Sequence, residues 1–117
     1  MKQLEKHFEI KVKNYLKEKN CWFVKYWGGI MFTKSGIPDI LCCCNGYFVA
    51  IELKSENGQP TKLQLHNLSK LKKNGAISLL LYPHYFNQFK RLIDCLLEFK
   101  YSDAKLLMDE INQKEVI

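Results

Sequence analysis

Residues 36–54 read GIPDILCCCNGYFVAIELK and carry the clearest structural signal in the sequence. Two apolar runs, residues 40–44 and 47–53, are separated only by Asn45 and Gly46. Asn-Gly between two such runs is the strongest short-range signal for a two-residue hairpin turn, because both central residues of that turn need a positive φ. The stretch therefore predicts a tight antiparallel hairpin.

The register of this hairpin brings two acidic residues together. Counting outward from the turn, Asp39 stands opposite Glu52, and opposed side chains share one face with Cβ atoms about 5 Å apart. Two like charges at that distance repel by about 3 kcal/mol at an effective dielectric constant of 20. A divalent cation such as Mg²⁺ would remove this cost, because it prefers carboxylate oxygens. Lys54 lies two residues beyond Glu52 and points to the same face.

The rest of the chain alternates helices and strands, without a repeat or a low-complexity linker. This order predicts an α/β fold with one mixed central sheet flanked by helices. We expect a single domain over residues 1–117, with a core over about 1–83 and additional C-terminal helices over about 84–117. The predicted elements are a helix over residues 3–18, a strand over 21–27 ended by Gly28-Gly29, the two hairpin strands, a helix opened by a Thr61–Gln64 capping box and ended by Gly75, a strand over 76–82, and helices over about 85–99 and 103–114.

The first predicted helix carries two further acids. Glu5 falls within the apolar arc formed by Phe8, Val12 and Leu16, and a carboxylate on a buried face needs a partner. Glu9 lies at the edge of the same arc, where we expect a surface ion pair with Lys13 rather than a metal-binding role.

Composition limits the class of protein. Hydrophobic residues make up 47% of the 117 residues, which is enough for a packed core. No apolar run approaches the roughly 20 residues that cross a bilayer, and the N-terminus has no apolar secretory segment, so we expect a cytoplasmic protein that does not engage a membrane. The net charge of +6 favours polyanionic partners, although many basic proteins bind none.

The five cysteines fit a reducing compartment. Cys42, Cys43 and Cys44 are consecutive and lack the spaced pairs that are typical of zinc ligands. We expect them to be buried, reduced thiols in a strand.

Carboxylates that hold metal ions, together with a lysine, suit the hydrolysis of a phosphodiester bond. Residues 36–39 (Gly-Ile-Pro-Asp) and 46–54 (Gly-Tyr-Phe-Val-Ala-Ile-Glu-Leu-Lys), followed by Gly58 and Gln64, resemble the VRR-type nuclease domain (VRR-NUC). That family belongs to the PD-(D/E)XK nuclease superfamily, which has the restriction-endonuclease-like fold with an αβββαβ core. The resemblance runs from the first helix to about Tyr82 and is strongest for the stand-alone phage and bacterial type.

The resemblance implies an Mg²⁺-dependent endodeoxyribonuclease, with Mn²⁺ as a substitute ion. It implies metal ligation by Asp39, Glu52, the Leu53 carbonyl and Glu5, and a catalytic role for Lys54. Relatives of this type act as dimers on branched DNA, so we expect a homodimer that cuts Holliday-junction or other branched DNA.

Several assignments have a structural alternative. Gln64 matches a glutamine of the family's site, but the capping box alone also explains it. Lys25, Lys34, Ser35 and Lys62 are candidate DNA contacts, and each could equally be a solvated surface residue or part of a turn. Trp22 and Trp27 are expected in the core rather than as platforms for base stacking. Apolar stripes on the last two helices could form a dimer interface or pack on the protomer's own sheet.

Two other functions are compatible with the sequence. A module that binds nucleic acid without cutting it would need the basic charge but not the opposed acids. A nuclease subunit that is active only within a larger assembly would keep the same site residues.

Overall fold

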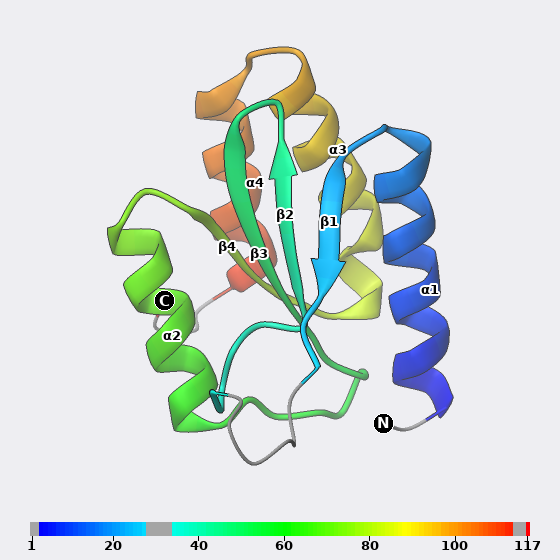
Figure 1. Ribbon diagram of the computed structural model, residues 1–117, viewed down its shortest axis with the longest axis vertical. Coiled ribbons are helices and arrows are strands. Elements are labelled where there is room, and N and C mark those ends of the chain that lie inside the picture. The colour runs from blue at the N-terminus through cyan, green and yellow to red at the C-terminus, as the bar shows by residue number, and fades with distance from the viewer. Residues whose placement is uncertain (1–2, 28–33, 114–116) are drawn as a thin grey trace.

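A computed structural model describes residues 3–27, 34–113 and 117, and Figure 1 shows their arrangement. The αβββαβ core is present and is followed by a 3-10 turn and two helices, so the predicted α/β, restriction-endonuclease-like fold is confirmed. Gly28-Gly29, the predicted end of the first strand, lies outside the described residues. The elements are α1 (Gln3–Glu18), β1 (Trp22–Lys25), β2 (Ile40–Cys44), β3 (Tyr47–Leu53), α2 (Lys62–Lys73), β4 (Ile77–Leu81), η1 (Pro83–Tyr85), α3 (Phe86–Leu97) and α4 (Tyr101–Asn112).

The sheet has the order β1-β2-β3-β4, with antiparallel pairs up to β3 and a parallel pair between β3 and β4. The predicted hairpin register is confirmed, because Cys44 pairs with Tyr47 and Ile40 pairs with Ile51. Asn45 and Gly46 have φ values of 52° and 88°, as this two-residue turn requires.

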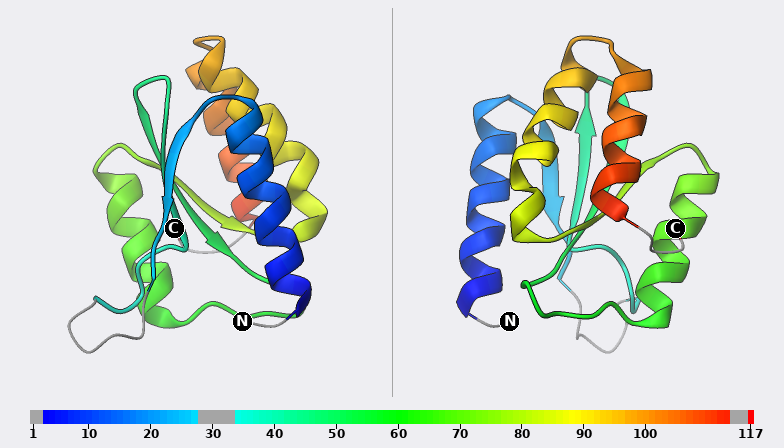
Figure 2. Two further views of the ribbon diagram at one scale, coloured as in Figure 1. Left: turned by 45° about the vertical axis from the view of Figure 1, so that its right-hand side comes forward. Right: turned by 180° about the vertical axis from the view of Figure 1, so that it is seen from behind.

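Helices cover the two faces of the sheet unequally (Figure 2). The inner face packs under α1, α3 and α4 and forms the main hydrophobic core, with Phe8, Val12 and Leu16 contributed by α1. On the outer face, α2 packs on β4 through Leu68 and Leu80. Among the described elements, α2 lies chiefly over β4 and β3, so the outer face of β1 is less covered than that of β4.

The free edge of β4 is closed by a side chain of α4. Asn112 donates through Nδ2 to the Ser78 carbonyl at 2.9 Å, and its Oδ1 accepts from the Leu80 N–H at 2.9 Å. Both bonds are buried, and they replace the contacts that a further strand would make. The chain can therefore end its sheet at β4 without leaving these two groups unpaired.

Several local expectations are corrected by the structure. Cys43 is exposed, because strand alternation turns it to the outer face. Trp22 and Trp27, expected in the core, are 67% and 71% exposed. In the described parts of the chain, no helix has the length and apolar character needed to cross a bilayer.

The last two helices bury most of their apolar stripes in the protomer's own core, whereas Leu106 of the second stripe is exposed. The buried apolar side chains of these helices are Phe89, Leu92, Ile93, Leu96, Ala104, Leu107, Met108 and Ile111.

Candidate active site

Asp39 and Glu52 lie together at the end of the sheet opposite the hairpin turn. Asp39 directly precedes β2, one position beyond the Ile40–Ile51 pair, and Glu52 is the corresponding residue of β3. The Leu53 N–H donates to Asp39 Oδ2 at 2.8 Å, which fixes the orientation of that carboxylate. The Tyr26 N–H donates to the Asp39 carbonyl at 2.8 Å and anchors its backbone. The tight turn has thus placed two acids side by side, as the register requires.

Glu52 is a carboxylate in an unfavourable environment. Its exposed fraction is only 3%. Burial raises the pKa of Glu52 to about 8, and the neighbouring charge of Asp39 adds to this shift. Lys54 acts in the opposite direction, with Nζ at 3.4 Å from Glu52 Oε2, but it does not cancel the shift. Burial therefore disfavours the ionised form of Glu52, and a bound cation would favour it.

A second ion-pair chain reaches Asp39 from the inner face. Glu9 of α1 is 6% exposed and accepts hydrogen bonds from Lys25 of β1, and its other oxygen lies 3.2 Å from Lys13 Nζ. Lys25 Nζ also lies 3.9 Å from Asp39 Oδ1. Burial raises the pKa of Glu9, but the two lysines outweigh that effect and hold it below its usual value. Glu9, Lys25 and Asp39 thus form a continuous chain of alternating charge.

These ion pairs change the expected position of Glu9 on α1. The expected Lys13–Glu9 pair is present, but Glu9 is buried rather than on the surface, and it also contacts Lys25. The period-two pattern of β1 could have indicated this contact, because Lys25 shares a face with Phe23, toward α1. Lys25, expected as a DNA contact, has only 13% of its side chain exposed.

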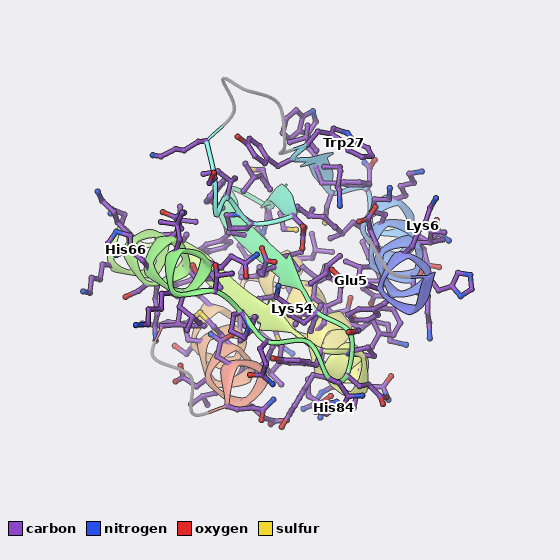
Figure 3. The ribbon with its side chains drawn as sticks, turned by 90° about the horizontal axis from the view of Figure 1, so that it is seen from below. Glu5, Lys6, Trp27, Lys54, His66 and His84 are labelled. Atoms are coloured by element: carbon purple, nitrogen blue, oxygen red, sulfur yellow. The ribbon has the colours of Figure 1, made fainter. Side chains whose placement is uncertain are left out.

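The remaining predicted site residues lie at the same end of the sheet. Glu5 of α1 is half-buried and lies on the side of that helix toward the sheet end that carries Lys54 (Figure 3). Gln64 forms the predicted capping box, since the Thr61 N–H donates to its Oε1 at 2.9 Å and its own N–H donates to Thr61 Oγ1 at 3.1 Å. The side-chain oxygen of Gln64 is therefore already occupied by the start of α2.

The donor set fits a hard divalent cation. Carboxylate oxygens are the ligands that Mg²⁺ and Mn²⁺ prefer, and the burial of Glu52 next to Asp39 raises its pKa, an effect that a bound cation would oppose. Asp39 and Glu52 would hold such an ion, with the adjacent Leu53 carbonyl as a further oxygen donor.

A groove lies between the loop that precedes β2 and helix α2. Lys34, Ser35 and Lys62 are exposed, and Asn67 Nδ2 ties the 35–36 loop to α2 by donating to the Gly36 carbonyl at 2.8 Å. A cavity of about 320 Å³ runs from this loop along α2; its lining residues are Lys34, Ile37, Pro38, Leu41, Phe48, Asn67, Lys70, Leu71 and Asn74. Most of this lining is apolar, and Lys34 and Lys70 supply its positive charge.

Comparison with known protein families identifies the family of this chain. The profile of the archaeal Holliday junction resolvase (Hjc) family matches residues 1–78, which include every residue of the acid and lysine cluster. No curated protein and no solved structure matches the chain significantly. The matched segment covers more than half of the chain, so the chain belongs to the archaeal Holliday junction resolvase (Hjc) family, a family of nucleases within the PD-(D/E)XK superfamily.

Proposed function

We propose that this protein is a metal-dependent endonuclease that cuts four-way junction DNA. The observation that carries the proposal is the pairing of Asp39 and Glu52 at the sheet end, with Lys54 beside them, within a Holliday junction resolvase family. Mg²⁺ is the proposed ion, and Mn²⁺ is expected to substitute for it. A finer placement of the chain in the VRR-type group rests on the sequence resemblance alone.

Each residue of the site has a proposed task. A divalent ion held by Asp39 and Glu52 would supply water activation and charge stabilisation at phosphorus. Lys54 lies close enough to the acids to donate a hydrogen bond to the attacking water or to a phosphate oxygen. Lys25 positions Asp39 and is itself fixed by Glu9. Glu5 is proposed to assist at the edge of the metal site.

DNA would approach the sheet end from the side shown in Figure 3. Lys34, Ser35 and Lys62 are proposed to contact the phosphate backbone, because they are exposed on the loop that leads to Asp39 and at the start of α2. Contacts with phosphate contribute affinity but do not distinguish one base from another. This suits an enzyme that selects DNA by its shape rather than by its sequence.

The direct test compares labelled linear, flap and four-way DNA in Mg²⁺, Mn²⁺ and EDTA. We expect cleavage of the four-way DNA with either ion and none in EDTA. Asp39→Asn is the most informative variant, because an amide oxygen can still accept from the Leu53 N–H while the ligand charge is lost. It should lose at least about 100-fold in rate, as should Lys54→Ala, by analogy with the loss of other transition-state contacts.

Glu56→Gln is the matched control. It removes an acid that lies two residues beyond Lys54 but is exposed, so cleavage should be unchanged. Full activity of Asp39→Asn, or cleavage in excess EDTA, would refute the proposed centre. DNA binding without products in either ion would favour a non-cutting module, and activity restored by an added partner would favour a subunit of a larger assembly.

We further propose that the enzyme acts as a homodimer, since two symmetric cuts in a two-fold substrate call for two sites. The outer sheet face offers an apolar surface for this contact. Cys43 pairs with both Trp22 and Phe48, so these three exposed residues form one row across β1, β2 and β3, and Val24 extends it. Trp22→Glu with Phe48→Glu should convert a dimer into a monomer in light scattering, and an unchanged mass would exclude this face.

A further inference from the structure

Three cysteines meet in the core at the hairpin end of the sheet. Cys42 and Cys44 alternate onto the inner face of β2, and Cys21 precedes β1 at the position opposite Cys44 in the continued β1–β2 register. The Cys42 and Cys44 sulfur atoms are 3.2 Å apart, and the Cys44 thiol lies 3.0 Å from that of Cys21. All three sulfur atoms lie within 4.8 Å of one another.

The cluster is dry and contains only sulfur donors. The exposed fractions are 9% for Cys21, 1% for Cys42 and 0% for Cys44. Burial and the hydrogen bond with Cys44 raise the pKa of Cys21 to about 12, and that of Cys44 is raised by its hydrogen bond with Cys42 and by burial. Since the thiolate is the form that binds a metal ion, an incoming ion has to displace the thiol protons.

We propose that Cys21, Cys42 and Cys44 form a binding site for a soft, thiophilic metal ion of the Cu(I) type. Thiolate ligands select soft ions. Metal–sulfur bonds of about 2.3 Å that meet at one ion place the sulfur atoms roughly 4 Å apart, which matches the size of the cluster. Structural zinc sites use four ligands, whereas this group of His, Cys, Asp or Glu side chains in the described chain has three members. Cu(I) accepts three.

On binding, the ion exchanges the ligands that delivered it for the cysteine sulfur atoms, and neither the ion nor the thiols change oxidation state. The ion enters, the sulfur–metal bonds form, and at least two thiol protons leave to solvent. Cys21 borders the surface and gives the path of entry, because it is the least buried of the three. The site lies at the opposite end of β2 from Asp39, so its proposed role is to fasten the connection between α1 and β1 to β2 rather than to take part in cleavage.

The chain contains its own control residues. Cys43 lies between two of the proposed ligands but is exposed on the other face, and Cys95 is half-buried on α3 and lies outside the cluster. Cys43→Ser and Cys95→Ser should therefore leave metal binding unchanged, whereas Cys44→Ser removes the central ligand. Cys21→Ser gives a second test at a less buried position, where a polar replacement is less disruptive to the fold.

The experiment titrates the reduced, metal-free protein anaerobically with Cu(I) delivered from a coloured chelator, in the absence of DNA. We expect one ion per chain, sulfur-only coordination in X-ray absorption, and a rise in melting temperature. Cys44→Ser and Cys21→Ser should weaken binding by more than about 100-fold, beyond what the loss of an outer-shell partner costs.

The proposal would be overturned if the native chain bound no Cu(I), if binding survived in a folded Cys21→Ser protein, or if binding were lost in Cys43→Ser. Tight binding of Zn²⁺ in preference to Cu(I) would overturn the three-ligand assignment. None of these measurements depends on nuclease activity, so the metal site and the proposed function can fail separately.

Discussion

Replacing Glu52 by glutamine should stabilise the metal-free protein at alkaline pH. The pKa of Glu52 is raised from 4.5 to about 8 by burial and by Asp39, so the folded state disfavours the ionised form. Below pH 4.5 Glu52 is protonated in both the folded and the unfolded state. As the pH rises from 4.5 toward 8, the unfolded chain ionises Glu52 more readily than the folded chain does, so the free energy of unfolding falls. At about 1.4 kcal/mol for each pKa unit, the full shift corresponds to roughly 4–5 kcal/mol. Because Lys54 loses its carboxylate partner in the variant, we expect a net gain of roughly 2–4 kcal/mol.

The assay is urea unfolding of both proteins in EDTA at pH 5 and pH 8.5. The two should differ little at pH 5 and clearly at pH 8.5, and added Mg²⁺ should stabilise only the native protein at pH 8.5. Glu9→Gln is the matched control, and we expect it to change stability in the opposite direction. The lysines beside Glu9 lower its pKa and so favour its ionised form. Removing that charge should therefore destabilise the protein at both pH values. A Glu52→Gln protein that is less stable than the native chain at pH 8.5 in EDTA would refute the reasoning.

Three further changes test other parts of the structure. Lys25→Met should lower single-turnover cleavage of junction DNA by about tenfold or more, because it releases both Glu9 and Asp39; unchanged rates would remove Lys25 from the site. Asn112→Ala should lower the free energy of unfolding by about 2 kcal/mol, measured in urea, because two buried groups of β4 lose their partner. Gly36→Ala should lower the melting temperature more than Gly46→Ala does, since both have a positive φ but only Gly36 would place a Cβ atom 2.6 Å from Leu63; equal shifts would contradict this.

The parts of the fold that local rules determine were predicted from the sequence. Asn45-Gly46 permits one hairpin register, and that register brought Asp39 to Glu52. Thr61 and Gln64 form the expected capping box. The end of α2 also agrees, because Gly75 has a φ of 99° directly after the Asn74 cap.

The parts that depend on how elements pack were not predicted. Strand alternation places Trp22 on the outer face, but its exposure arises because α2 packs on β4 and leaves β1 uncovered. Burial of Glu9 depends on the approach of α1 to β1, where Lys25 meets it. Helical periodicity assigned both acids of α1 to one arc but could not decide which of them Lys25 would contact.

The two bonds of Asn112 have a consequence for any shortened form of this protein. A chain that stopped after α3 would keep the whole sheet, yet it would present the bare Ser78 carbonyl and Leu80 N–H of β4 to its neighbours. An open strand of that kind is a template for fibril growth. The final helix therefore protects the edge of β4 from intermolecular strand pairing. A shortened form that retains the nuclease residues should keep α4.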